Sequence, residues 1–323
     1  MTTRITKPGL YRELVTERAY HADPVASPSL SSSVAKLLLE KTPLHAWVSH
    51  PRLNPNYEPD ESEKYDLGKT AHALMLCGED AIAVVDADSY RSNAAKKARD
   101  DARESFKIPI LASKLVEVKR MVEAGREQID RLTDPVDRRA FVQGTGRPEQ
   151  TLVWREDEAW CRARLDWDPD RVPDEPFAIH DYKTTSASAH PEEWVRTLYN
   201  MQGDVQAGFY RRGIRAVLGV ELPDFRFIVQ EIKPPYALSC IALSPGALDM
   251  AERKAIVAID LWKRCTTEKL WPGYPAQTYF VDPPRYEESR WIEREEAAKV
   301  ALDSKIDLFK RASDWQAPLN WEK

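Results

Sequence analysis

Three ionisable residues in two neighbouring segments could form a catalytic group. Asp166 closes one alternating apolar segment, and Asp181 and Lys183 lie two residues apart in the next, FAIHDYK. Side chains two apart on a β-strand share a face, so Asp181 and Lys183 should point one way, and His180 and Tyr182 the other. If the two strands are neighbours, Asp166 can join the face of Asp181.

Two carboxylates beside a lysine suit metal-assisted phosphodiester hydrolysis. Mg²⁺ prefers oxygen ligands and usually takes one or two carboxylates, which leaves positions for water and a substrate phosphate. A lysine beside the ion can orient or deprotonate the attacking water. A charged pair inside an apolar strand is costly unless it is paired or binds a metal, which favours a function for Asp181 and Lys183. A buried structural ion pair is the alternative.

The spacing D-x(14)-D-x-K from Asp166 to Lys183 resembles the PD-(D/E)XK nuclease superfamily. Three further segments sharpen the resemblance: GKTAHAL at 68–74, RARLD at 162–166 and QAGFY at 206–210. Their order is similar to that in the RecE-like (exodeoxyribonuclease VIII-like) phage exonucleases of the RecB-type branch. The segments YHAD at 20–23 and SLSSS at 29–33 resemble the opening of that family, so the likeness spans residues 20 to 275.

The resemblance implies a metal site and a catalytic lysine. His72, Asp166 and Asp181, with the backbone carbonyl of Tyr182, would hold Mg²⁺ or Mn²⁺, and Lys183 would activate or position water. Gln206 and Tyr210 would orient Lys183 or the scissile strand.

The implied activity is exonucleolytic degradation of one strand of linear double-stranded DNA, 5′ to 3′, in phage-type homologous recombination. The implied partners are duplex DNA ends and a single-strand annealing protein that takes the 3′ overhang, in the cytoplasm of a bacterial host. Related exonucleases form rings, so a homo-oligomer is expected by analogy. An endonuclease of the same superfamily and an inert DNA-binding module are the alternatives. An inert module would be marked by loss of an acidic residue or of the lysine. Asp166, Asp181 and Lys183 are all present here, which argues against that alternative.

Two residues outside the central motif have open interpretations. His72 lies in a helix predicted from Lys64 to Cys77, and Gly68 one turn earlier leaves room for a strand or a metal to approach. Taken alone, His72 would be a partly buried helix residue, but the order of the downstream motifs favours a ligand. Glu149 opens a predicted hairpin and either assists the metal or is a surface charge.

Several polar residues are candidates for contacts to the DNA backbone. In the hairpin, Arg162 and Arg164 alternate onto one face, where they could bind a phosphate, brace the carboxylates or form a structural salt bridge. A long helix from Pro191 to Leu218 should carry a polar ladder that begins at Gln202 and ends in a basic cluster, which either binds phosphates or is a solvated helix cap. The DNA-binding candidates are Arg162, Arg164, Gln202, Arg211 and Arg212.

Composition limits the class of protein. The chain has 323 residues, 42% apolar content and a net charge of −5. The negative charge disfavours a coat protein that binds DNA along its length, although a local basic groove would suffice for a nuclease. The four cysteines have no C-x-x-C spacing, which argues against a zinc or iron–sulfur site and for reduced cytosolic thiols. No run of about 18 apolar residues predicts a membrane span, and the N-terminus lacks a secretory apolar region.

These patterns predict an α/β fold of the restriction-endonuclease-like kind, with a mixed central sheet flanked by helices. We expect an extended segment at 1–28 and a nuclease domain at 29–275, with a helical part at 29–132 and a catalytic core at 149–275. A Pro-rich segment and a charged helix at 287–312 should follow within 276–323. Strands are predicted at 81–86, in a hairpin at 149–166, at 177–183, at 225–233 and at 237–243.

Overall fold

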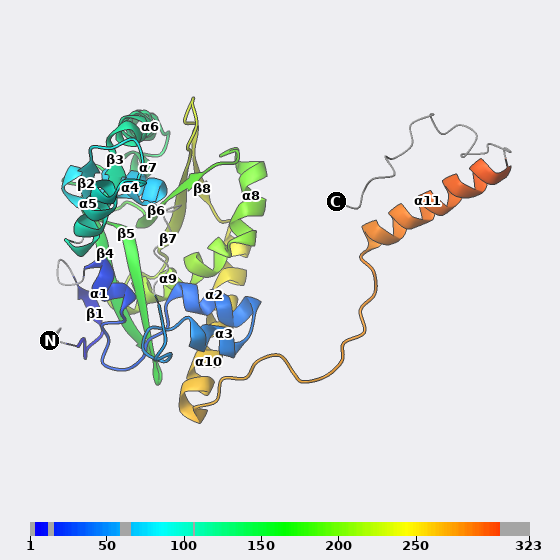
Figure 1. Cartoon of the computed structure of the whole chain (residues 1–323). Helices are drawn as coiled ribbons and strands as arrows, with labels where there is room; N and C mark the ends of the chain where they lie inside the picture. The colour runs from blue at the N-terminus through cyan, green and yellow to red at the C-terminus, as the bar shows by residue number, and fades with distance from the viewer. Residues whose placement is uncertain (1–3, 12–15, 59–65, 106, 304–323) are drawn as a thin grey trace, which may run out of the picture. The chain divides into compact units, whose positions relative to one another are not determined.

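A six-stranded mixed sheet forms the centre of the computed structural model, which describes residues 4–11, 16–58, 66–105 and 107–303 (Figure 1). The strand order is β1-β4-β5-β6-β7-β8; β6 and β7 run parallel, and the other neighbours are antiparallel. The strands are Gly9–Tyr11 (β1), Gly146–Glu156 (β4), Ala159–Pro169 (β5), Ala178–Thr185 (β6), Asp224–Glu231 (β7) and Leu238–Ala242 (β8). A mixed central sheet is what the sequence predicts.

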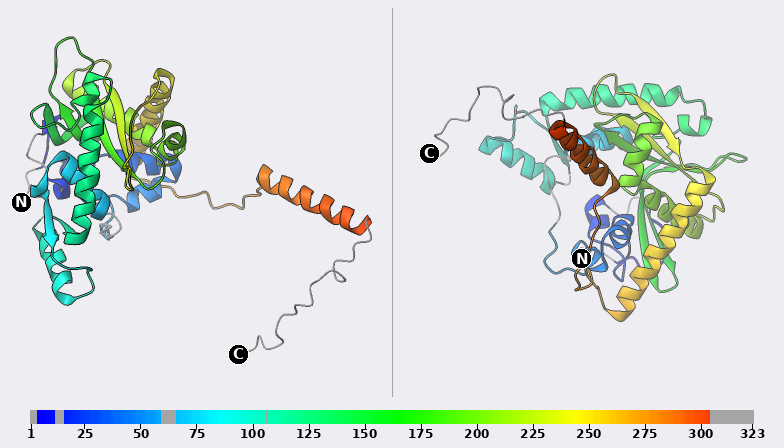
Figure 2. Two further views of the ribbon diagram at one scale, coloured as in Figure 1. Left: turned by 90° about the horizontal axis from the view of Figure 1, so that it is seen from above. Right: turned by 90° about the vertical axis from the view of Figure 1, so that its right-hand side faces the viewer.

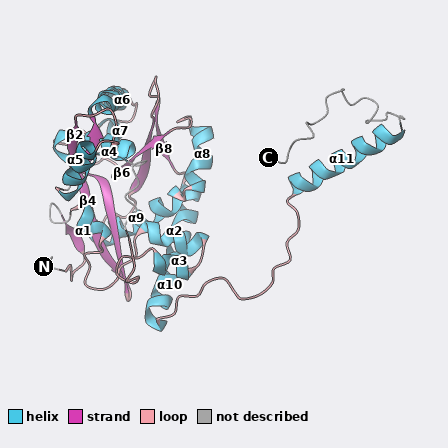
Figure 3. Cartoon of the chain, viewed as in Figure 1, coloured by secondary structure: helices cyan, strands magenta, loops and turns pink. Residues whose placement is uncertain are grey.

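Helices cover both faces of this sheet (Figures 2 and 3). One core lies under Ser32–Glu40 (α2), Pro43–Val48 (α3), Pro191–Asn200 (α8), Gly203–Leu218 (α9) and Pro245–Glu268 (α10). The second core lies under Asp66–Leu76 (α4) and Ala112–Asp130 (α6). Beside it are the parallel pair Ile82–Val85 (β2) and Ile108–Leu111 (β3) and the helices Asn93–Glu104 (α5) and Pro135–Arg138 (α7).

Local sequence explains the elements that matter most for the site. The predicted hairpin is confirmed: β4 and β5 pair toward a turn at Glu156–Ala159, with one interruption between Pro148 and Gln150. A serine N-cap begins α2, since the Ser31 hydroxyl accepts a hydrogen bond from Val34 N at 3.4 Å. Helices α9 and α10 pack so closely that a Cβ on Gly208 would lie 2.3 Å from the Ala251 carbonyl oxygen. Only glycine fits there, and this contact fixes the helix that carries Gln206.

The N-terminal part is more ordered than the sequence suggests. Residues 1–28 were predicted to be extended and loosely structured, yet β1 pairs with β4, and Glu17–His21 (α1) is a short helix. Asp23 and Val25 are fully buried. The Asp23 carboxylate binds Ser29 and ion pairs with Arg162 on β5, so a long-range contact invisible in the local pattern orders this segment.

Two other boundaries differ from the predictions. The helix predicted from Pro191 to Leu218 breaks between α8 and α9, because Gln202 adopts a left-handed backbone conformation with φ 52°. The predicted linker 133–148 contains α7 and the start of β4. Lys64 and Tyr65, predicted to begin the helix of His72, lie outside the described residues.

The described chain divides into two units, one ending at Tyr274 and the other beginning at Pro275. In the second unit, residues 275–284 form no helix or strand, and Arg285–Asp303 (α11) is a helix. The part of the predicted C-terminal helix beyond residue 303 lies outside the described residues. No helix in the described part of the chain has the length and apolar character needed to cross a membrane.

Candidate active site

Strand β6 presents its ionisable residues as the alternation predicts. Asp181 and Lys183 share one face, where the Lys183 ammonium forms an ion pair with Asp181 Oδ2. On the opposite face, His180 Nε2 lies 2.7 Å from Asp137 Oδ1. Because Asp181 is only 2% exposed and Lys183 is also largely covered, this pair is held away from bulk water.

Helix α4 and strand β5 bring a second group to the same region. The Asp166 Oδ2 atom accepts a hydrogen bond from the backbone N–H of Tyr182 at 2.9 Å, which ties β5 to β6. The same oxygen lies 3.0 Å from His72 Nε2. A Cβ on Gly68 would meet only Thr184 Oγ1, at 3.6 Å, so α4 rests against β6 at the point where His72 reaches Asp166.

Glu149 belongs to this cluster and is not an exposed surface charge. The register of β4 and β5 sets Glu149 opposite Asp166, but the regular pairing is interrupted there and Glu149 has a φ of 58°. A left-handed glutamate within a strand is uncommon and strained, and such outliers gather at functional sites. Its Oε1 lies 3.3 Å from His72 Nδ1, and its Oε2 pairs with Arg164. Arg164 thus braces a carboxylate, one of the roles predicted for it.

The electrostatics show that the cluster attracts positive charge. Burial opposes protonation of His72, but Asp166 and Glu149 outweigh it and raise its pKa to about 9. Burial and the neighbouring Asp166 raise the pKa of Glu149. Burial also raises the pKa of Asp181, while for Lys183 the carboxylates of Asp181 and Asp166 overcome burial and raise its pKa. In its protonated form, the positively charged ring of His72 lies between the carboxylates of Asp166 and Glu149, where a metal cation would otherwise supply the positive charge.

Gln206 fixes the orientation of Asp181. Its side-chain amide donates a hydrogen bond to Asp181 Oδ1 at 2.6 Å. The other oxygen, Oδ2, is buried and, apart from its ion pair with Lys183, has no hydrogen-bonding partner among the described residues. Gln206 is therefore at the site, in contact with the carboxylate rather than with Lys183.

The donor set fits a hard divalent cation. The ligand atoms of His72, Glu149 and Asp166 lie within 4.8 Å of one another. Asp181 is outside that group of three but within electrostatic reach of both Asp166 and His72. Carboxylate oxygens with one imidazole are ligands that Mg²⁺ or Mn²⁺ accepts, and the incompletely hydrogen-bonded Asp181 Oδ2 is available to complete such a set.

Two predicted site residues do not touch this cluster. Tyr210 is buried between α9 and the sheet, where it packs edge-on against Phe225 and hydrogen bonds to Ser32. Gln202 lies at the N-terminus of α9, outside a continuous helical ladder, and its side-chain oxygen is buried without a hydrogen-bonding partner in the described structure. The ladder was inferred from an unbroken helix, and the break before Gly203 removes that premise.

Three of the predicted DNA-binding arginines are engaged inside the protein. Arg162 is 3% exposed and donates to the Ser29 hydroxyl at 2.8 Å. Arg211 donates to Glu252 at 2.9 Å, and Arg212 donates to both carboxylate oxygens of Glu156 at 2.7 and 3.0 Å. Each guanidinium already satisfies a buried or half-buried partner, which favours a structural role over a contact to DNA phosphates.

The sequence predicts no role for Tyr20, although the YHAD segment at 20–23 is part of the family resemblance. The Tyr20 ring is buried, with the guanidinium carbons of Arg162 and Arg164 at 5.4 and 5.9 Å from its centroid. It therefore covers the arginine that holds Glu149. An aromatic residue next to a histidine in an N-terminal segment is too weak a signal to predict such a contact.

Comparison with known proteins agrees with this architecture. No family model matches the chain, and no curated protein matches it in sequence. Among solved structures, the chain is similar to a crystal structure from Eubacterium rectale named "putative exonuclease", with a TM-score of 0.52 and 11% identity over 85% of this chain and 97% of that one. The predicted fold class is confirmed. The core is restriction-endonuclease-like, a six-stranded mixed sheet flanked by helices.

A second acidic cluster lies on the opposite face of β6 and is unsuited to a metal. Asp137, His180 and Cys240 have close ligand atoms, but the Arg226 guanidinium already donates to Asp137 Oδ1 at 2.7 Å. Burial and the nearby Asp137 carboxylate raise the pKa of the Cys240 thiol, which keeps it protonated. A bound cation would have to displace Arg226, so this cluster is a structural network.

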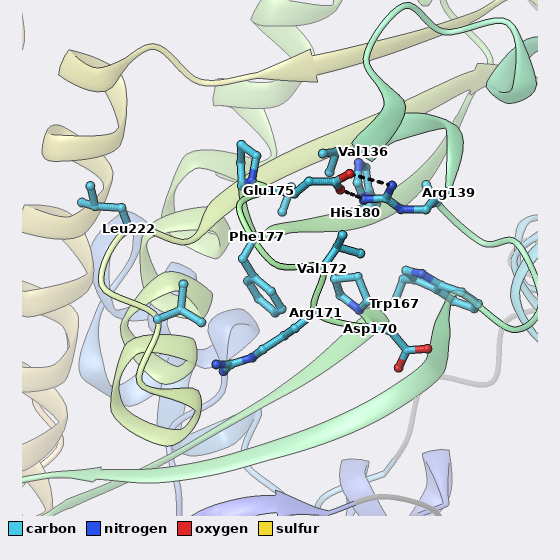
Figure 4. Close-up of a pocket in the computed structure, with 15 residues that line it drawn as sticks. Val136, Arg139, Trp167, Asp170, Arg171, Val172, Glu175, Phe177, His180 and Leu222 are labelled. Atoms are coloured by element: carbon cyan, nitrogen blue, oxygen red, sulfur yellow. Dashed lines mark hydrogen bonds and ion pairs between the residues drawn. The ribbon is translucent and has the colours of Figure 1, made fainter.

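A cavity of about 390 Å³ adjoins that network (Figure 4). His180 and Trp167 form part of its wall, together with Arg139 and Glu175, which form an ion pair. The residues that line the cavity include both acidic and basic side chains, and none of Asp166, Asp181 and Lys183 is among them. We therefore place the chemistry on the other face of β6.

The His72 imidazole gives the first test. Because the metal-free pKa is about 9, His72 is protonated at neutral pH, and a metal that binds its nitrogen must displace that proton. Metal affinity should rise about tenfold per pH unit below this pKa and level off above it. Calorimetry in two buffers of different ionisation enthalpy should show about one more proton released by the wild type than by His72→Ala. Equal proton release and equal metal affinity in the two proteins would assign His72 a structural role.

Arg212 gives a test of this structural role. Arg212→Ala should lower the free energy of unfolding by about 1–3 kcal/mol, since it leaves the Glu156 carboxylate without its bidentate partner. The salt dependence of DNA binding should stay unchanged, because no phosphate contact is lost. A salt slope flatter by about one unit would return Arg212 to the DNA-binding surface.

Proposed function

We propose that this protein is a metal-dependent deoxyribonuclease that degrades linear double-stranded DNA from its ends. The observation that carries the proposal is the convergence of His72, Asp166, Asp181 and Lys183 in one cluster beside β5 and β6, with Gln206 bonded to Asp181. The fold similarity to a protein named an exonuclease supports it. The resemblance of the ordered motifs to RecE-like enzymes extends the proposal to 5′ to 3′ polarity, a homo-oligomer and an annealing partner in recombination.

The residues of this chain have distinct tasks in the proposed reaction. His72, Asp166 and Asp181, with Glu149 beside them, would hold Mg²⁺ or Mn²⁺; the backbone carbonyl of Tyr182 is proposed as a further ligand. When bound, the ion polarises the scissile phosphate and lowers the pKa of the attacking water. The Tyr182 N–H holds Asp166 in position, and Gln206 holds Asp181. Each ligand is thus oriented by a second polar group before substrate arrives.

Lys183 acts in this scheme as a fixed cation. The carboxylates of Asp181 and Asp166 raise its pKa, so the ammonium persists at neutral pH and donates hydrogen bonds. It can orient the attacking water or neutralise charge that develops on the phosphate oxygens. Removal of a water proton by Lys183 would first require weakening of its ion pair with Asp181.

DNA topology provides the experiment. With equal enzyme and metal, linear duplex should be converted to small products while covalently closed plasmid persists, because the closed circle offers no end. The net charge of −5 also disfavours binding along the length of a duplex, since that affinity comes from basic residues that neutralise phosphates. Rapid nicking of the closed plasmid would instead show an endonuclease. Tight binding of linear DNA without any metal-dependent product would show an inert binding module.

A further inference from the structure

One lysine beside the proposed site, Lys36, lies outside the segments that carry the nuclease resemblance. Lys36 lies in the middle of α2, between Ala35 and Leu38, which are buried in the core and fix the helix against the sheet. The residue is itself half-buried. Its position is therefore set by packing, unlike that of a lysine on a solvated face.

The contacts of α2 direct Lys36 toward the site. Ser32 and Lys36 are four residues apart, so they lie on one stripe of the helix. Ser32 hydrogen bonds to Tyr210 on α9, one turn beyond Gln206. Lys36 lies within electrostatic reach of Lys183 and Asp181 on β6 and of Asp204 on α9.

The neighbouring acids already have other partners. Lys254 on α10 binds Asp204 Oδ2 at 2.6 Å, and Asp181 is held by Lys183 and Gln206. Within the described residues, Lys36 has no hydrogen bond or ion pair to either carboxylate. Burial and the nearby Lys183 lower its pKa to about 8. A half-buried cation beside another cation is unfavourable until an anion arrives.

We propose that Lys36 is a second phosphate-binding residue of this site, which binds the backbone phosphate next to the scissile one. The inference rests on the proposed function and deepens it. Of the three lysines near Asp181 and Asp204, Lys183 and Lys254 each pair with one carboxylate, so in the described structure the charge of Lys36 is left without a partner. A phosphodiester that bridges Lys36 and Lys183 would balance this charge, and would set the register of the strand relative to the water bound near Lys183.

A combined protein and substrate substitution tests the proposal. Lys36→Met should lower kcat/KM on linear duplex about 10- to 100-fold, and Lys36→Arg should recover most of this loss. Lys41→Met, which removes an exposed lysine at the end of the same helix, is the control and should cleave like the wild type. The Mn²⁺ concentration for half-maximal activity should not change in Lys36→Met.

Methylphosphonate substrates locate the contact. A neutral methylphosphonate placed at each linkage near the DNA end in turn should slow the wild type strongly at the linkage beside the cleaved bond. At that linkage the methylphosphonate should not slow Lys36→Met any further, because the lysine charge that the phosphate would have contacted is already absent. Two results would overturn the inference while the wild type still cleaves. One is that the effects of Lys36→Met and of the methylphosphonate add at every linkage, and the other is that Lys36→Met cleaves as fast as the wild type. Absence of any cleavage by the wild type would instead overturn the proposed function.

Discussion

Asp181→Asn is expected to lower the rate of DNA cleavage by about 10³-fold or more, while the protein remains folded. The asparagine has the same shape but loses the charge that holds Lys183 and would bind the metal. Burial raises the pKa of Asp181, so removing its charge relieves an unfavourable interaction and should cost little stability. The measurement is single-turnover cleavage of labelled linear duplex, together with the melting temperature and the metal affinity, which should fall with the rate.

A matched control separates the loss of chemistry from the loss of a buried acid. Asp137→Asn removes a buried carboxylate that faces the other side of β6 and binds His180 and Arg226. It should lower the melting temperature but leave the rate per folded molecule near that of the wild type. A rate for Asp181→Asn within a few-fold of the wild type would remove Asp181 from the mechanism.

Lys183→Met should lower the rate by about 10²- to 10⁴-fold with metal affinity retained or increased. The substitution keeps the length of the side chain but removes the ammonium, so the Asp181 carboxylate is left with more negative charge for a cation. This split between rate and metal affinity distinguishes Lys183 from the metal ligands. Lys263→Met, which breaks an ion pair with Asp157 outside the site, is the control and should have no effect on the rate.

If Lys183→Met and Asp181→Asn both lost metal affinity to the same degree, Lys183 would act only by shaping the carboxylate. Wild-type cleavage by Lys183→Met would exclude it from the reaction. Lys183→Arg offers a further comparison, because it keeps the charge while changing its position relative to Asp181.

The part of the site that depends on strand alternation could be predicted from the sequence. The FAIHDYK segment has period-two polarity, so the shared face of Asp181 and Lys183 follows from the pleat. The order of motifs also led to His72, which lies 3.0 Å from Asp166 although 94 residues separate them in the chain (166 minus 72). The first feature rests on local geometry, which the sequence records directly, and the second rests on the resemblance of the ordered motifs to a known family.

The features that were missed depend on partners distant in sequence. Arg211 and Arg212 look like a basic helix end until Glu252 and Glu156 are brought to them by α10 and the β4–β5 turn. The left-handed conformation of Gln202 divides a helix whose apolar periodicity is continuous. Gly203 beside it is tightly packed, since a Cβ there would lie 3.2 Å from Leu198 Cγ and 3.3 Å from Phe227 Cζ, and such packing leaves no sign in the composition.

Glu149 and Lys36 illustrate a further limit. The backbone of Glu149 has to adopt a conformation that glutamate rarely takes, and only the assembled hairpin imposes it. Lys36 looks like an ordinary lysine on an amphipathic helix until the packing of α2 against α9 brings it within electrostatic reach of Asp181. The sequence left the role of Glu149 open and gave Lys36 none, and both join the site through charge that the fold concentrates rather than through a recognisable motif.

Metal dependence is the central claim, and one assay addresses it directly. Protein freed of metal with a chelator is mixed with end-labelled linear duplex, and Mg²⁺, Mn²⁺ or EDTA is added, with Asp181→Asn prepared in parallel. The account predicts that the wild type releases small products with Mg²⁺ or Mn²⁺ and none with EDTA, and that Asp181→Asn releases none under any condition. Equal cleavage in EDTA, or intact DNA with both metals and folded wild-type protein, would contradict it.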